Sequence, residues 1–96
     1  MLTYTSAYKF LADGVHGEVL DFPGVITCGS DISQARKLMA GAMIDMAETN
    51  IGLGESLPTP QIGISDSDAD IVEPIHLILN AASGVREIPE IIYEAA

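Results

Sequence analysis

Residues 21–35, with the sequence DFPGVITCGSDISQA, decide the fold because they contain a turn, a strand and the start of a helix in direct succession. Pro23-Gly24 sets a tight turn, and the β-branched run Val25–Cys28 after it predicts a short strand. Asp31 is a typical N-cap residue, and Gln34 stands three positions later, as a capping box requires. The stretch therefore predicts a strand that leads directly into a helix.

An apolar stripe continues from this cap. Its members recur at helical spacing: Ala35, Leu38, Met39, Ala42, Met43 and Met46. Such a stripe indicates a helix that packs one face against a sheet. Asn50 and Gly52 are expected to end the helix in left-handed geometry. The glycines and prolines that follow forbid long regular structure, so residues 52–70 are predicted to be a connection.

An antiparallel hairpin is predicted before the turn. Residues 2–12 alternate between apolar and polar side chains, and this alternation predicts a strand with one buried face. That face consists of Leu2, Tyr4, Tyr8, Phe10 and Ala12. Asp13-Gly14 follows, a strong hairpin signal because its turn needs positive φ at both central residues. Residues 15–22 supply the second strand, so the first three strands form a meander.

The last third of the chain leaves two interpretations open. Ile71-Val72 and the apolar run Ile75–Leu79 form either one strand interrupted at Pro74, or a short strand followed by a helix that Pro74 starts. Because β-branched residues suit a sheet, we expect a fourth strand within residues 70–80. The final PEIIYEAA, residues 89–96, is predicted to be a short helix or a tail that orders against another chain.

These elements predict the α+β class, with one antiparallel β-β-β-α-β domain over residues 1–96. Residues 1–51 hold the hairpin, the third strand and the main helix, residues 52–70 the connection, and residues 71–96 the fourth strand and a short tail. A chain of 96 residues is too short for two cores, and its 48% apolar content is enough for one. With 5% aromatic residues, that core is expected to be aliphatic.

The charge is strongly one-sided. Fourteen acidic residues against four Lys and Arg give a net charge of -10. Because nucleic-acid binding rests on cations that meet phosphates, direct contact with nucleic acid or an anionic membrane is not expected. After Lys37 the only fixed positive charge is Arg86, whereas ten carboxylates follow. This asymmetry predicts a basic protein partner. Without a basic leader or a membrane-length apolar run, the chain is expected to be cytoplasmic.

Reactive constellations are sparse in the sequence. Cys28 is the single cysteine, so no intrachain disulfide is predicted. Nothing in the sequence brings His16 or His76 beside Cys28, so neither a cysteine hydrolase nor a transition-metal site is predicted. Residues 66–70, DSDAD, begin like a calcium loop, but Ile71 takes the place of the glycine that such a loop needs. We therefore expect no cofactor, no metal and no enzymatic activity.

The whole series of elements resembles the HicB antitoxins over residues 2–60. The matching features are Asp13-Gly14, DFPG at 21–24, TCGSD at 27–31, the helix with Ala35, and GESLPTP at 54–60. The resemblance implies a reduced ribonuclease H-like layer without that enzyme's catalytic carboxylates. It also implies a partner, a small basic RNA-cleaving toxin of the HicA type. In such pairs the antitoxin neutralises the toxin sterically, by occupying the surface that the toxin would present to RNA.

The chain departs from many HicB antitoxins in its last part. Those proteins carry a carboxy-terminal helix-turn-helix or ribbon-helix-helix module that binds DNA. Only 26 residues follow Asp70 here, and Arg86 is the one basic residue among them. Because such a segment could make almost no phosphate contacts, we expect no DNA-binding module in it.

Three carboxylates are predicted to contact the partner: Glu18 in the second strand, Asp21 at its end and Asp31 before the helix. Two other functions remain open. One is a solitary HicB-like protein without a toxin partner, which associates with itself into a dimer or a higher homo-oligomer. The other is a metal-dependent ribonuclease H-like enzyme in which Asp21 and Asp45 supply metal ligands.

Overall fold

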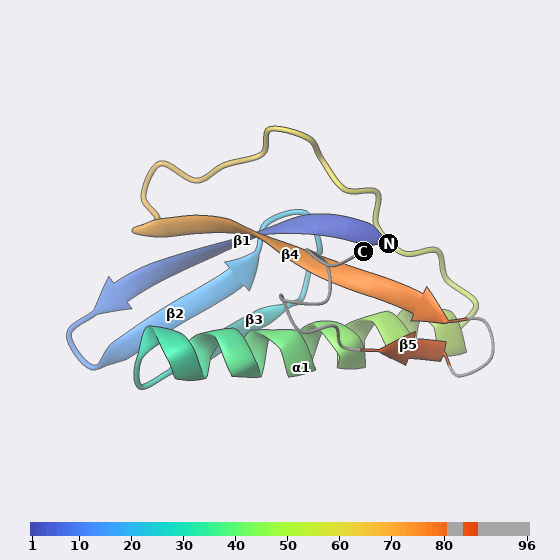
Figure 1. Ribbon diagram of the computed structural model, residues 1–96, viewed down its shortest axis with the longest axis horizontal. Helices are drawn as coiled ribbons and strands as arrows, with labels where there is room; N and C mark the ends of the chain where they lie inside the picture. The colour runs from blue at the N-terminus through green and yellow to red at the C-terminus, as the bar shows by residue number, and fades with distance from the viewer. Residues whose placement is uncertain (81–83, 87–96) are drawn as a thin grey trace, which may run out of the picture.

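The computed structural model describes residues 1–80 and 84–86. This part of the chain forms one antiparallel sheet and one helix (Figure 1). The elements follow in the order β1 (Leu2–Leu11), β2 (Gly14–Val19), β3 (Ile26–Gly29), α1 (Ile32–Gly52), β4 (Ile71–Asn80) and β5 (Gly84–Arg86). The predicted α+β, β-β-β-α-β arrangement is confirmed, and β5 is an addition that the sequence did not indicate. The predicted helix or tail at residues 89–96 lies outside the described residues.

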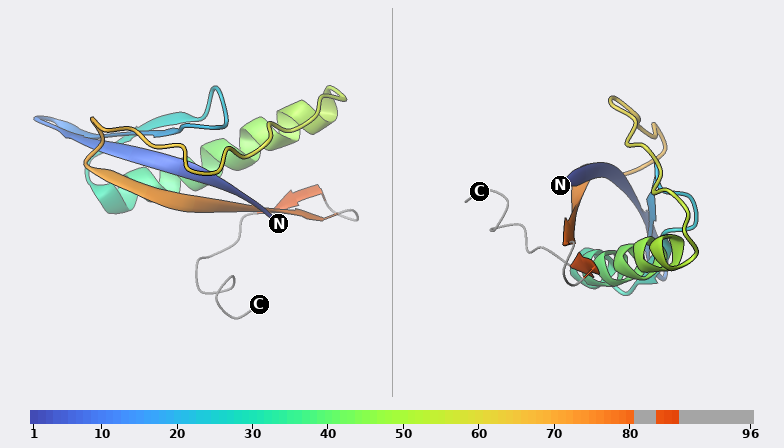
Figure 2. Two further views of the ribbon diagram at one scale, coloured as in Figure 1. Left: turned by 90° about the horizontal axis from the view of Figure 1, so that it is seen from above. Right: turned by 90° about the vertical axis from the view of Figure 1, so that its right-hand side faces the viewer.

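Strand β1 lies at the centre of the sheet, whose strand order is β3-β2-β1-β4-β5. It pairs antiparallel with β2 on one side and with β4 on the other. The sheet curves around α1, which lies against its concave face (Figure 2). Residues 53–70 contain no helix or strand and connect α1 to β4, in agreement with the predicted connection.

The fourth strand settles the alternatives at residues 70–80, because β4 runs through Pro74 without interruption. Pro74 is opposite Thr5, whose own N–H and C=O are both engaged on the β2 side, with Asp21 and Leu20. Pro74 therefore occupies a non-hydrogen-bonded pair, and its nitrogen faces the edge that β5 leaves open. The missing N–H costs no ladder hydrogen bond there.

The hairpin between β1 and β2 is confirmed, but its turn lies one residue earlier than predicted. Leu11 pairs with Gly14, so Ala12 and Asp13 are the central residues. No described residue other than glycine has positive φ, and the prediction of positive φ at Asp13 is therefore wrong. Gly14 is needed for another reason: a Cβ there would lie 2.6 Å from the carbonyl oxygen of Gly29.

The core lies between α1 and the concave face of the sheet. The helix contributes Ala35, Met39, Met43 and Ala47, all buried and each four positions apart. The sheet and the β2–β3 turn contribute Tyr4, Tyr8, Val15, Val19, Phe22, Val25 and Leu77. Because three of these residues are aromatic, the prediction of an aliphatic core is wrong. Leu38 and Phe10, both predicted to be buried, are 46% and 51% exposed, and Ala12, predicted on the same buried face as Phe10, is exposed in the turn after β1, so these three predictions are wrong. Leu38 lies outside the i, i+4 row, and Phe10 lies near the end of β1.

The end of α1 also differs from the prediction. The helix continues to Gly52, and the left-handed residue after it is Gly54, with φ of 74°, rather than Asn50 or Gly52. The N–H of Leu53 bonds to the Thr49 carbonyl at 3.0 Å, and that of Gly54 bonds to the Ile51 carbonyl at 3.0 Å. These bonds satisfy carbonyls that the last turn leaves free. Helix α1 is not apolar enough over its length to cross a membrane.

Candidate partner-binding surface

Asp21, in the turn two residues after β2, holds two distant parts of the chain together. Its side chain is buried, with 3% exposed. Oδ1 accepts a hydrogen bond from the Thr5 N–H at 2.9 Å, and Oδ2 accepts one from the Gln61 N–H at 2.9 Å. Both carboxylate oxygens are thus engaged by backbone donors, one in β1 and one in the connection. The arrangement gives Asp21 a structural role that the sequence analysis did not predict.

Tyr4 anchors the same connection at a second point. Its hydroxyl donates a hydrogen bond to the Pro58 carbonyl at 2.7 Å, while its ring packs against Phe22 with centroids 5.1 Å apart. Burial raises the pKa of Tyr4 above its ordinary value of 10.0, and the charge of Asp21 raises it further. Two hydrogen bonds therefore hold residues 58–61 of the connection, one from Tyr4 at Pro58 and one to Asp21 at Gln61.

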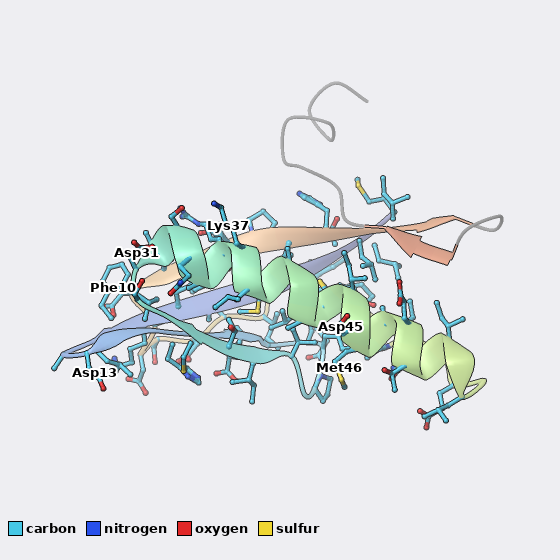
Figure 3. All side chains as sticks on the ribbon, turned by 90° about the horizontal axis from the view of Figure 1, so that it is seen from below. Phe10, Asp13, Asp31, Lys37, Asp45 and Met46 are labelled. Atoms are coloured by element: carbon cyan, nitrogen blue, oxygen red, sulfur yellow. The ribbon has the colours of Figure 1, made fainter. Side chains whose placement is uncertain are left out.

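Asp31 caps helix α1 as predicted. Its Oδ1 accepts the Gln34 N–H at 2.8 Å, and the Gln34 side-chain oxygen in turn accepts the N–H of Ser30. The Asp31 side chain remains exposed. Asp31 and Phe10 lie at the same end of the molecule, where α1 begins and β1 ends (Figure 3). Here an exposed carboxylate and a half-exposed aromatic ring are both accessible to a partner.

Glu18 lies on the other face of the sheet, which we call the outer face because α1 covers the opposite one. Residues paired across an antiparallel ladder share a face, and Glu18 pairs with Ala7 and Ile26. Glu18 is half-buried, whereas Ile26 is 56% exposed. The structure thus places Glu18, Asp21 and Asp31 in three different surroundings rather than in one cluster.

The acidic stretch 66–70 is tied to strand β1. Lys9 Nζ donates to the Asp68 carbonyl at 2.6 Å, and the Asp70 carboxylate accepts the Phe10 N–H at 2.7 Å. The N–H of Asp70 bonds to the Tyr8 carbonyl at 2.8 Å. Through these contacts the connection passes along β1 on its way to β4 (Figures 1 and 2).

A three-ligand metal cluster does not occur in the described part of the chain, where no three His, Cys, Asp or Glu side chains gather. Asp45, the second carboxylate of the ribonuclease H-like alternative, is exposed on α1. Its supposed companion Asp21 is buried beneath two backbone hydrogen bonds. The geometry gives this alternative no support.

One pair of side chains corrects the sequence analysis. Cys28 and His16 are direct cross-strand neighbours on β3 and β2, with Cys28 Sγ 3.7 Å from His16 Nδ1. The statement that nothing brings a histidine beside Cys28 is therefore wrong. The β2–β3 register decides this contact, and the register depends on the length of the turn between the strands.

Among solved structures, the N-terminal domain of the antitoxin HicB from Burkholderia pseudomallei has the same architecture. The two superpose with a TM-score of 0.63, covering 81% of this chain and 100% of that chain, at 21% sequence identity. The chain has a HicB-like fold. No protein-family model and no curated protein matches the sequence. The HicB-like resemblance inferred from residues 2–60 is thus confirmed at the level of the fold.

On this HicB-like fold, Asp31 presents its carboxylate to solvent and Glu18 does so in part. Asp21 instead fixes the connection against β1. A signal for the Asp21 role exists in the sequence, since a carboxylate next to a buried aromatic and a Pro-Gly turn suits backbone hydrogen bonding. The sequence does not indicate which backbone N–H groups bind Asp21, because Thr5 and Gln61 lie 16 and 40 positions away from it.

Proposed function

We propose that the chain is an antitoxin-like protein that binds and sterically neutralises a small basic RNA-cleaving toxin of the HicA type. The observation that carries the proposal is the HicB-like fold, which matches the full length of an antitoxin domain. The net charge of -10 supports it, because a toxin that cleaves RNA needs a cationic surface to meet phosphates. An acidic protein competes for that surface.

Steric neutralisation requires contact and no chemistry. Opposite charges steer the two proteins together and set the orientation of the encounter, while buried side chains set the lifetime of the complex. We assign the charged contacts to Glu18 and Asp31, whose carboxylates reach solvent. Asp21 contributes as a positioning residue, because it fixes the connection beside β1. In this account the protein is not an enzyme and works in the cytoplasm without binding nucleic acid or membrane.

Binding to a purified basic toxin at low salt tests the proposal. Isothermal titration is expected to give a stoichiometric complex whose affinity falls as salt is added, because screening weakens charge pairs. The absence of binding to every toxin of this type at low salt would reject the proposal.

Three variants that each remove one negative charge locate the contacts: Glu18→Gln, Asp31→Asn and Asp45→Asn. Asp45 is the matched control, since it is exposed on α1 and lies 14 positions after Asp31, about 21 Å along the helix axis. The first two variants are expected to slow association and to weaken its salt dependence more than the control. Equal slowing in all three variants would contradict the assigned contacts.

A homo-oligomer without a toxin partner is the second candidate function. The short strand β3 favours it, because β3 lies at one edge of the sheet and carries the exposed Ile26. An open edge and an apolar side chain are features that two copies of a chain bury together. Sedimentation of the chain alone across a range of concentrations tests this candidate.

A further inference from the structure

Strand β5 covers only the last part of one edge of β4. The ladder between the two strands runs from Asn80, opposite Gly84, to Ile78, opposite Arg86 (Figure 1). Residues 71–75 of β4 pair with β1 on their other side, and on this side they meet no strand within the described chain. This stretch of β4 is therefore an open edge, a feature that proteins usually cover or interrupt.

Apolar side chains beside this edge are incompletely covered on both faces of the sheet. Ile71 and Ile75 lie on the concave face and pack against the core, yet both are only partly buried. On the outer face Val72 is 40% exposed. The connection does not cover the edge, because its last residue, Asp70, bonds to β1 on the opposite side of β4. One more strand beside residues 71–75 would bury apolar surface on both faces.

We propose that residues 87–92 of the same chain continue β5 along this edge and complete its ladder with β4. The described pairs of β5 already set the register, because each residue added after Arg86 moves one position back along β4 from Ile78. In this register Ile92 is opposite Val72. The six residues 87–92 are as many as the ladder needs to reach Val72, so no loop or gap is required.

The sequence of this segment suits an edge strand. Residues 87–92 read EIPEII, and the three β-branched isoleucines favour a strand. In the proposed register Ile88 and Ile92 lie on the outer face, where Ile92 becomes the cross-strand neighbour of the exposed Val72. Ile91 lies on the concave face, beside the part of the core that β4 covers incompletely. The segment therefore supplies apolar side chains on both faces that lack cover.

Two prolines discriminate between registers, and both are compatible with this one. Pro89 is opposite Ile75 in a non-hydrogen-bonded pair, so its nitrogen points away from β4 and no ladder bond is lost. Pro74 is opposite Glu90 in a hydrogen-bonded pair, where its carbonyl can accept the Glu90 N–H and only one bond is missing. A shift of one residue would place Pro89 opposite Pro74 and leave that pair without a donor. Because Pro89 has no N–H, it also makes the new edge a poor template for a further strand.

Amide hydrogen exchange of the full chain, followed by NMR, tests whether the edge is covered. The Glu73 N–H faces β1 and the Val72 N–H faces the open edge, because neighbouring residues of a strand direct their N–H groups to opposite sides. We expect both amides to be protected in the full chain. Truncation after Arg86 is expected to speed exchange at Val72 about tenfold and to leave Glu73 protected. Exchange at Val72 that is equally fast with and without residues 87–96 would overturn the proposal.

Disulfide cross-linking of the full-length chain tests the register without truncation. In a Cys28→Ser background, Val72→Cys with Ile92→Cys is expected to form a disulfide within one chain in a glutathione buffer, because the Cα atoms of such a pair lie about 5.5 Å apart. Val72→Cys with Ile91→Cys is the matched control, since Ile91 would project from the opposite face, and this pair is expected to stay reduced. Equal oxidation of the two pairs, or a disulfide that joins two copies of the chain, would overturn the proposal. Because these measurements use the chain alone, their outcome is independent of toxin binding.

Discussion

Asp21 Oδ2 accepts a hydrogen bond from the backbone N–H of Gln61 at 2.9 Å, although 40 positions separate the two residues. The other oxygen of the same carboxylate binds the Thr5 N–H. One buried side chain thereby supplies the hydrogen-bond acceptors for two backbone N–H groups, one in the central strand and one in the connection. Asp21 acts just beyond Val19, the last residue of β2, where β1 continues without a strand partner on that side.

Replacing Asp21 with alanine is expected to lower the free energy of unfolding by about 1–3 kcal/mol, because two backbone donors lose their partner inside the protein. Urea unfolding measures the loss. Asp45→Ala is the control, since Asp45 is exposed, and it is expected to change stability by about 0.5 kcal/mol or less. Equal effects of the two substitutions would contradict the structural role of Asp21.

Tyr4 is expected to make stability fall at alkaline pH. Its pKa in the folded protein is raised above the ordinary 10.0, first by burial and then by Asp21. A raised pKa means that the neutral phenol stabilises the fold below pH 10, and that this contribution is lost as the pH rises through the folded-state value. Unfolding measured between neutral pH and about pH 11 should show a steeper decline for the native chain than for Tyr4→Phe. Parallel curves would contradict this origin of the decline.

Two substitutions at Asp31 separate helix capping from partner binding. Asp31→Ala is expected to cost about 1 kcal/mol of stability, because the Gln34 N–H loses its acceptor. Asp31→Asn keeps an acceptor oxygen and is expected to change stability little. Thermal unfolding measures both values. If Asp31→Asn weakens toxin association while stability is unchanged, the negative charge itself acts in binding; unchanged association would contradict the contact assigned to Asp31.

Two glycine substitutions test the packing of α1 on the sheet. In Gly29→Ala the new Cβ would lie 2.6 Å from the backbone nitrogen of Ala35, which is fixed in the first turn of α1. We expect a loss of about 1–3 kcal/mol in the free energy of unfolding. In Gly41→Ala the Cβ meets no atom within 4 Å, and the better helix former is expected to add about 0.5–1 kcal/mol. A loss at both positions would contradict the packing described here.

Local patterns predicted much of this fold. The capping residues Asp31 and Gln34, the β-branched residues of β3 and β4, and the hairpin after residue 12 are short-range signals, and each produced the expected element. The exposure of Phe10 and Leu38 escaped prediction because it depends on where α1 begins over the sheet and on which row of the helix faces the sheet. Strand β5 escaped it because Gly84–Arg86 has little strand signal of its own and pairs with the end of β4.

The Cys28–His16 contact shows why registers are harder to predict than elements. If Pro23-Gly24 were a two-residue hairpin turn, Cys28 would pair with Val19. Instead the Val19 N–H bonds to the Val25 carbonyl at 2.9 Å, and the wider turn that this bond closes moves Cys28 opposite His16. Burial of Phe22 and Val25 in the core stabilises the wider turn. A tertiary contact thus decides a pairing that the local sequence leaves open.

The central claim is that this chain works by covering the RNA-binding surface of a basic toxin. Its most direct test is RNA cleavage by a purified toxin of the HicA type, measured while this chain is added in increasing amounts. The account predicts a linear loss of cleavage that is complete at stoichiometric amounts, with RNA and the chain competing for the toxin. Unchanged cleavage at saturating amounts of the chain, or inhibition that leaves RNA bound to the toxin, would contradict the claim.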